Sequence, residues 1–153
     1  MIGLLTQQQS EYILQCNTVG RIGCYANNKV LIIPITYVFS QKCIYGHSWE
    51  GTKISMMRKN PQVCFQVDSI DNLANWRSVI AWGKFEELKT EVAQNKVIRL
   101  FHERLAPLML GETVNVAREF ADPPHIVQKK RKPILYRIGL TEVTGRYEKQ
   151  TTL

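Results

Sequence analysis

Apolar runs that are too short for long helices dominate the sequence, and turn residues separate them. Arg21 to Tyr25 and Val30 to Phe39 have the composition of strands, and Asn27-Asn28 between them is typical of a two-residue hairpin turn. A second turn, Ser40 to Lys42, leads into Cys43 to His47. This spacing predicts three consecutive antiparallel strands arranged as a meander.

Three further strands are expected later in the chain. Gln62 to Val67 alternates polar and apolar residues, which is the pattern of a half-buried strand. Arg77 to Leu88 predicts a long strand in which Gly83 marks a bulge or a close approach of two backbones. Ile134 to Val143 predicts a closing strand, whereas the polar segment from Asp68 to Asn75 predicts a loop.

Helices are expected beside these strands. Thr6 and Gln9 form a capping box for a helix that runs to about Cys16, and Thr52 to Arg58 predicts a short helix. Thr90 caps a third helix with apolar residues at helical spacing, namely Val97, Leu100, Phe101 and Leu105. The pattern predicts a mainly β fold with flanking helices, an antiparallel barrel or strongly curled sheet, in a single domain over residues 1–153.

Charge and cysteine usage narrow the classes of function. Lysine and arginine total 20 against 13 acidic residues, and this excess of +7 favours an anionic partner such as a phosphate-bearing small molecule, nucleic acid or a membrane surface. The four cysteines include no Cys-x-x-Cys pair, so we expect no metal site and reduced thiols in a cytoplasmic protein. No signal peptide is recognisable, and the apolar run Val30 to Phe39 is too short to span a bilayer.

Three segments carry residues suited to chemistry. From His47 to Lys53 a strand ends, Gly51 permits a turn and a helix opens, so backbone N–H groups and the Lys53 ammonium can cradle a phosphate. The alternative is that Thr52 only caps the helix and Lys53 is solvated. Trp76-Arg77-Ser78 offers a stacking face and a guanidinium, or else a packed Trp and an Arg paired with a nearby Asp.

The third segment is Pro34-Ile35-Thr36-Tyr37. Because proline cannot donate to a strand ladder, Pro34 predicts an edge or a bulge there. The irregular backbone and the hydroxyl groups of Thr36 and Tyr37 could line a planar heterocycle, although an ordinary edge strand explains the same residues.

Together these segments resemble, in order and spacing, the FMN-binding split-barrel proteins related to pyridoxamine 5'-phosphate oxidase, and within that family the nitroimidazole-resistance flavoproteins. The resemblance covers about residues 4–90. Val143 to Arg146 resembles the family's closing strand. The segments that carry it are Val19 to Gly23, Pro34 to Tyr37, His47-Ser48 with Gly51 and Lys53, Asn60 to Asp68, and Trp76 to Val79 with Gly83.

The resemblance implies a six-stranded antiparallel split β-barrel that pairs as a homodimer, with FMN in two clefts at the subunit interface. By position, the phosphate and ribityl chain would lie near His47, Ser48, Gly51, Thr52 and Lys53. The isoalloxazine ring would lie against Pro34, Ile35, Thr36 and Tyr37, and the site would be completed, from either subunit, by Trp76, Arg77 and Ser78. Trp49, Glu50 and Thr52 depart from the family pattern, and the C-terminal segment that binds substrate in pyridoxamine 5'-phosphate oxidases is missing, so pyridoxal phosphate synthesis is not expected.

The expected function is that of an FMN-dependent oxidoreductase. It would pass electrons from a reduced donor to a small acceptor such as a nitroaromatic or a quinone, with His47 as a candidate proton donor or as a ligand of the cofactor. A non-catalytic flavin or haem carrier or sensor is the alternative, because fold alone does not separate carrier from enzyme. The basic run Lys129 to Lys132 raises a less favoured alternative, a single-stranded nucleic-acid-binding barrel. Residues 107–124 predict no element.

Overall fold

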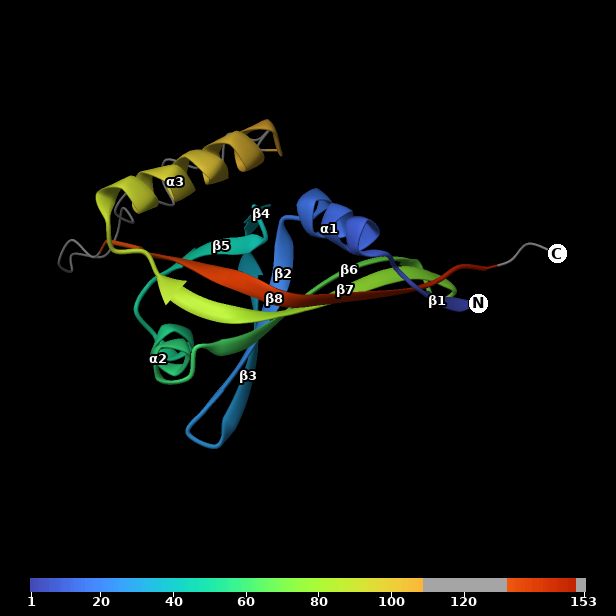
Figure 1. The fold of residues 1–153 in the computed structure, drawn as a ribbon, viewed down its shortest axis with the longest axis horizontal. Coiled ribbons are helices and arrows are strands. Elements are labelled where there is room, and N and C mark those ends of the chain that lie inside the picture. The colour runs from blue at the N-terminus through green and yellow to red at the C-terminus, as the bar shows by residue number, and fades with distance from the viewer. Residues whose placement is uncertain (109–131, 151–153) are drawn as a thin grey trace.

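The computed structural model describes residues 1–108 and 132–150, which form one curled antiparallel sheet with three α-helices around it (Figure 1). The strands are β1 (Ile2–Leu4), β2 (Val19–Ala26), β3 (Lys29–Thr36), β4 (Val38–Ser40), β5 (Cys43–Ser48), β6 (Gln62–Asn72), β7 (Asn75–Glu87) and β8 (Ile134–Glu148). The helices are α1 (Gln7–Cys16), α2 (Thr52–Lys59) and α3 (Glu91–Leu105), and a 3₁₀ turn, η1 (Ala106–Leu108), follows α3.

The order of the strands in space explains the curled shape. They lie side by side as β3-β2-β6-β7-β8-β5-β4, and β1 pairs with the end of β8. Every ladder is antiparallel. The predicted mainly β fold with flanking helices is confirmed, but the described residues contain eight strands where the sequence predicted six. The two additional strands, β1 and β4, have three residues each, too few to show a period in the sequence.

The predicted meander is wrong. The run from Val30 to Phe39 is interrupted at Tyr37, whose backbone N–H donates to the Thr18 carbonyl at 2.9 Å. The chain therefore leaves β3 and enters a separate β4–β5 hairpin, and β5 pairs with β8 instead of β3. As a result β3 lies at one end of the sheet, and Pro34 stands in an edge strand, as its missing N–H predicted.

The segment from Asp68 to Asn75 is not the predicted loop. β6 continues to Asn72 and β7 begins at Asn75, so only a two-residue turn joins them. The polar residues belong to the exposed end of a long hairpin, where side chains need no core to face. β8 likewise runs five residues beyond the predicted end at Val143, because β7 and β1 pair with it on both sides.

The predicted turns and caps are present. Asn27 and Asn28 both have positive φ (53° and 58°), the conformation of a tight hairpin turn that asparagine tolerates. The Thr6 side chain accepts from the Gln9 N–H and the Gln9 side chain accepts from the Thr6 N–H, which completes the capping box of α1. At Gly83 the β7–β8 register shifts, and a Cβ there would stand 2.4 Å from the Gly139 carbonyl oxygen.

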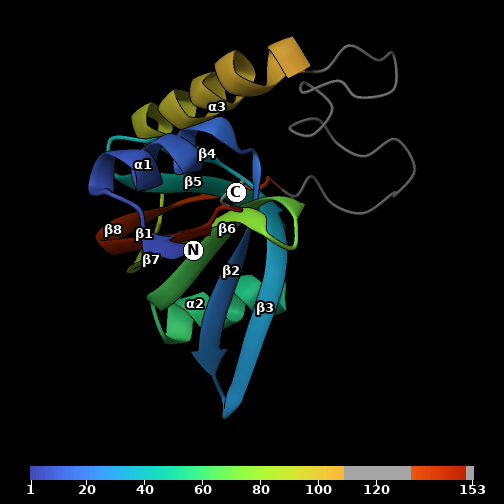
Figure 2. The same ribbon diagram turned by 90° about the vertical axis from the view of Figure 1, so that its right-hand side faces the viewer.

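The core lies in two parts. The larger fills the curled sheet between α1 and α2, which Figure 2 shows above and below the strands, and it contains Ile13 and Leu14 of α1 with Ile54 and Met57 of α2. The smaller lies under α3, where Phe101 and its neighbours pack on β5 and β8. No helix within residues 1–108 and 132–150 has both the length and the hydropathy that a membrane span requires. The expectations for residues 109–124 and 129–131 lie outside the described residues.

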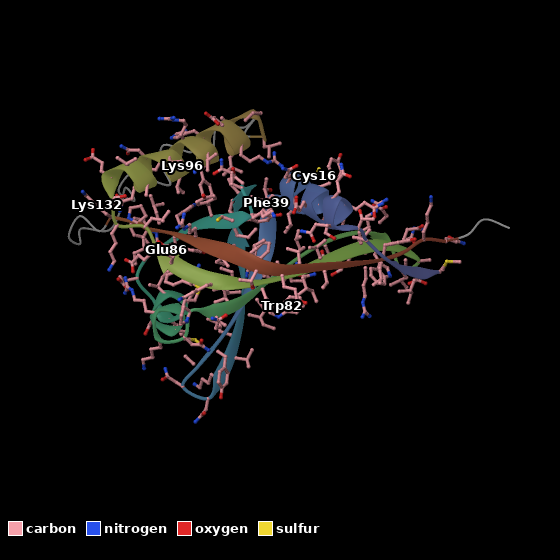
Figure 3. All side chains as sticks on the ribbon, in the orientation of Figure 1. Cys16, Phe39, Trp82, Glu86, Lys96 and Lys132 are labelled. Atoms are coloured by element: carbon pink, nitrogen blue, oxygen red, sulfur yellow. The ribbon has the colours of Figure 1, made fainter. Side chains whose placement is uncertain are left out.

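One side of the sheet is covered by none of the helices in residues 1–108 and 132–150, and we call it the open face. Strand register and alternation assign residues of β2, β3, β6 and β7 to it, and Figure 3 shows one of them, Trp82, on the side away from α1 and α3. Large apolar side chains here are exposed to solvent, Ile32 by 70% and Trp82 by 39%. The residues of the open face are Val19, Arg21, Gly23, Ile32, Pro34, Thr36, Cys64, Gln66, Asp68, Trp76, Ser78, Ile80 and Trp82.

Candidate functional site

The junction between β5 and α2 has the features of an anion-binding site. β5 ends at Ser48, and Gly51 is the N-cap of α2, with no side-chain hydrogen bond to the first turn. The alternative interpretation, in which Thr52 caps the helix, is therefore wrong. Because no side chain among the described residues accepts from the first N–H groups of α2, these groups can bind an external acceptor.

Lys53 is half-buried in the first turn of α2. Burial lowers the pKa of its ammonium below the ordinary lysine value, and an electrostatic interaction with Cys24 of β2 partly opposes that shift. Within the part of the chain that the structure describes, no carboxylate or hydrogen-bond acceptor pairs with Lys53. A partly desolvated cation without a partner is unfavourable alone and is stabilised by a bound anion.

The acidic residue of this junction is already neutralised. Glu50 pairs with Arg58 Nη1 at 2.8 Å, and Arg58 also binds Glu87 of β7 through Nε and Nη2, each at 3.0 Å. The hydrogen bond from Arg58 holds the pKa of Glu87 below its usual range. The loop is thus fastened to the end of β7 and leaves Trp49 with 41% of its surface exposed.

His47 and Ser48 do not share a direction. They are consecutive in β5, so their side chains point to opposite sides of the strand. The His47 ring meets the ring of Phe101 in α3 edge-on, with 5.1 Å between centroids. Ser48 Oγ donates to the Trp49 carbonyl at 3.1 Å, beside the start of α2.

The same alternation divides the segment Pro34 to Tyr37. Pro34 is exposed and Thr36 is half-buried on the open face, whereas Ile35 and Tyr37 enter the core. Tyr37 is fully buried, and its hydroxyl donates to the Leu14 carbonyl at 2.7 Å. Burial raises the pKa of this hydroxyl. The hydroxyl that the sequence offered to a ligand is therefore already used inside the fold.

Trp76, Arg77 and Ser78 are also separated by strand alternation. Trp76 Nε1 donates to Glu148 at 2.9 Å, and Ser78 accepts a long hydrogen bond from Gln66 at 3.4 Å. Arg77 faces the other side and lines a hollow of about 470 Å³ against α1. No ion pair joins Arg77 to an Asp in the described residues. The alternative in which Arg77 pairs with a nearby Asp is therefore not observed there.

Lys53 and Arg77 do not meet within one chain. Lys53 interacts with Cys24, which pairs with Val63, whereas Arg77 pairs with Ser69. Six residues separate Val63 from Ser69 along β6, which is a distance of roughly 20 Å at the usual rise of a strand. A single chain therefore places the predicted site residues in two separate groups, one at the β5–α2 junction and one at the start of β7.

A polar cluster on the open face was missed in the sequence. Arg21, Gln66 and Asp68 join with the predicted site residue Ser78 in one network of side-chain contacts. Arg21 had appeared in the motif Val19 to Gly23, and Gln66 and Asp68 in the motif Asn60 to Asp68, but no local pattern links residues 45 or more positions apart. The partners of Arg21 are set by the β2–β6 register, which is a tertiary property.

Comparison with known proteins identifies the class. The family model for pyridoxamine 5'-phosphate oxidase matches residues 6–147, and the chain belongs to this family. The curled sheet has the split-barrel fold of that family. An uncharacterised protein of Rhizobium meliloti (strain 1021) is 29% identical over 87 residues, and this match spans 57% of the chain and 58% of that relative's length.

Solved structures share the fold over nearly the whole chain. An FAD-binding protein from Mesorhizobium loti is 25% identical with a TM-score of 0.73, covering 96% of this chain and 98% of that one. An FAD-binding protein from Mycobacterium smegmatis is 20% identical with a TM-score of 0.68, covering 97% and 100%. A Bacteroides thetaiotaomicron protein, provisionally assigned to 5-nitroimidazole antibiotic resistance, is 14% identical with a TM-score of 0.69, covering 96% and 87%. The resemblance to the pyridoxamine 5'-phosphate oxidase family that the sequence indicated is confirmed.

Proposed function

We propose that this chain binds FMN at the β5–α2 junction and the edge of β3, and that it is a flavin-dependent oxidoreductase. The observation that carries the proposal is Lys53, a half-buried cation that has no ion pair or hydrogen bond among the described residues and lies at a helix start that none of their side chains caps. A phosphate monoester is a dianion near neutral pH, and it suits such a set of donors. Membership of the pyridoxamine 5'-phosphate oxidase family and the flavin named for two structural neighbours support the choice of ligand.

Different residues of the chain would bind the phosphate end and the ring of the cofactor. Lys53, the first turn of α2 with Gly51 and Thr52, and the Ser48 hydroxyl would take the phosphate end. The ring would lie against Pro34 and Thr36, whose side chains face outward from β3. Ile35 and Tyr37 would shape this wall from behind, and His47 would act from the α3 side of β5. A bound flavin supplies the electron-transfer chemistry, while the protein sets its position and its electrostatic surroundings.

We propose further that two chains pair through the open face. Exposed Ile32, Ile80 and Trp82 form an apolar surface that a second copy would cover. The separation of Lys53 from Arg77 supports pairing as well, since a second chain can supply Trp76, Arg77 and Ser78 to the junction of the first. A reduced small molecule would donate electrons and a nitroaromatic or quinone would accept them. A cytoplasmic location, with four free thiols, completes the proposal.

The proposal is tested by titrating purified protein with FMN and with FAD while the flavin absorbance and fluorescence are followed. Lys53→Ala is expected to weaken FMN binding by at least about tenfold, since a charge-assisted contact is worth about 1.5–3 kcal/mol. Lys59→Ala is the matched control, because Lys59 lies on the same helix and binds Asn27. Wild-type protein that binds neither flavin, or equal affinity in the two variants, would contradict the phosphate site.

Enzyme and carrier are separated by a second measurement. The flavin is reduced without oxygen, and a nitroimidazole or a quinone is added while the flavin spectrum is recorded. Reoxidation faster than that of free reduced flavin supports the oxidoreductase. Equal rates across several acceptors would favour the carrier, and a protein without flavin that binds single-stranded RNA in a salt-sensitive manner would favour the nucleic-acid alternative.

A further inference from the structure

The polar cluster lies in the middle of the open face, where its neighbours are exposed apolar side chains. Arg21 Nη1 lies 3.5 Å from Asp68 Oδ2 and 3.3 Å from Gln66 Oε1. Gln66 Nε2 donates to Asp68 at 2.8 Å and more weakly to Ser78 at 3.4 Å. One carboxylate and one amide thus hold one side of the guanidinium in place.

Arg21 is also the direct partner of Pro34 across the β2–β3 ladder. Directly opposed residues on one face have Cβ atoms roughly 4.5–5.5 Å apart. The side chains of Arg21 and Pro34 are both exposed on that face, with 47% of the Arg21 side chain accessible. The Arg21 Cβ therefore lies next to Pro34, and its guanidinium extends over the same open face toward Gln66 and Asp68 of β6.

Some N–H donors of the Arg21 guanidinium are not used by any acceptor of the described residues. Both of its contacts are made by Nη1, so within the described residues Nε and Nη2 have no protein acceptor. A guanidinium presents its N–H groups as a planar fork that matches neighbouring acceptor atoms on a planar ligand. The pyrimidine half of a flavin ring carries such acceptors, and the reduced ring gains negative charge there.

We propose that Arg21 is a positioning residue for the flavin ring, held by Asp68 and Gln66, and that its charge favours the reduced cofactor over the oxidised one. The inference rests on the proposed flavin function and goes beyond it, since it assigns control of the redox balance to a residue outside the phosphate site. A fixed positive charge in a crevice shielded from water acts more strongly than a mobile surface charge. Asp68 and Gln66 contribute by fixing the direction of the guanidinium.

The test measures the midpoint potential and the dissociation constant of bound FMN in Arg21→Gln, Arg21→Lys and Asp68→Asn. Lys29→Gln is the matched control, because it removes the same charge from the far end of β3. Arg21→Gln is expected to bind oxidised FMN within about threefold of wild type but to lose at least tenfold in the preference for reduced FMN. That loss corresponds to a midpoint potential lower by about 30 mV. Arg21→Lys should fall between these two proteins, and Asp68→Asn, which removes the negative charge beside Arg21, should shift the midpoint potential in the opposite direction.

Two results would overturn the assignment. A midpoint potential in Arg21→Gln equal to that of Lys29→Gln would show that the charge is not felt by the ring. An Arg21→Gln protein that becomes monomeric and loses flavin would show that Arg21 serves only the contact between chains. If wild type takes up no flavin, the proposed function fails first and the inference fails with it, which the titration with FMN reveals on its own.

Discussion

Lys53 of α2 and Arg77 of β7 lie near different parts of β6: Lys53 interacts with Cys24, the partner of Val63, whereas Arg77 pairs with Ser69, roughly 20 Å further along that strand. No rotation of either side chain spans that distance. If both cations hold one phosphate group, they come from different chains. Under the proposed function, the location of these two residues would link cofactor binding to self-association.

The first prediction concerns that link. Ile80→Arg places a charge in the middle of the open face, where wild type has an apolar side chain with 37% exposure. We expect self-association to weaken by at least about tenfold, because a central apolar contact of an interface is commonly worth more than 1 kcal/mol. Flavin occupancy should fall with it. Light scattering coupled to gel filtration, with the flavin absorbance recorded on the same run, measures both.

Val92→Arg is the control for this experiment. Val92 lies on α3 with 83% exposure, away from the open face, and the variant should keep the mass and the flavin of wild type. A fully flavin-loaded monomer of Ile80→Arg would show that one chain suffices.

The second prediction concerns pH. Burial lowers the pKa of Lys53, whereas a bound phosphate favours the charged ammonium and raises it. FMN affinity should therefore be constant below the pKa of Lys53 in the free protein and fall as the pH rises through it. Because that pKa lies below the ordinary value of about 10.4, the fall should begin at a lower pH than an exposed lysine would give. Lys53→Arg, which stays charged, should show no such fall in titrations from about pH 7.5 to about pH 10.

The third prediction compares two buried tyrosines. Tyr37 donates to the Leu14 carbonyl, so Tyr37→Phe should lower the free energy of unfolding by about 0.5–1.5 kcal/mol. The Tyr136 hydroxyl is buried without a partner among the described residues, and burial raises its pKa. Tyr136→Phe should leave stability unchanged or raise it by up to about 1 kcal/mol, since an unmet hydroxyl is removed. Urea unfolding of both variants measures the difference, and equal destabilisation of the two would mean that Tyr136 has a hydrogen-bond partner.

The fourth prediction compares two glycines of neighbouring strands, Gly83 of β7, which is opposite Leu140, and Gly139 of β8, which is opposite Lys84. A Cβ on Gly83 would meet the Gly139 carbonyl oxygen at 2.4 Å, whereas a Cβ on Gly139 would meet nothing within 4 Å. Gly83→Ala must move backbone and should cost about 1–3 kcal/mol in thermal or urea unfolding. Gly139→Ala should cost less than about 0.5 kcal/mol. A stable Gly83→Ala variant would show that the bulge relaxes freely.

Local signals were sufficient where neighbouring residues fix the structure. Thr6 and Gln9 cap α1, and Asn27-Asn28 adopt the positive φ values of a tight turn, both as the sequence predicted. The break at Tyr37 and the long β6–β7 hairpin were not predicted, because distant partners decide them. Tyr37 leaves the strand to meet Thr18 and Leu14, and the exposed hairpin end needs no apolar alternation.

The candidate site also combines features that neighbouring residues fix with features that distant partners decide. From the sequence came the family and the helix start with Lys53, since these depend on short runs of residues, whereas the structure decided that Gly51 and not Thr52 is the N-cap. Strand pairing decided which side chains share a direction, and it separated His47 from Ser48, Tyr37 from Pro34, and Arg77 from Ser78. It also brought Arg21 beside Pro34 and joined it to Asp68. A side chain's own identity sets its chemistry, but the register of its strand sets its neighbours, and register depends on the whole sheet.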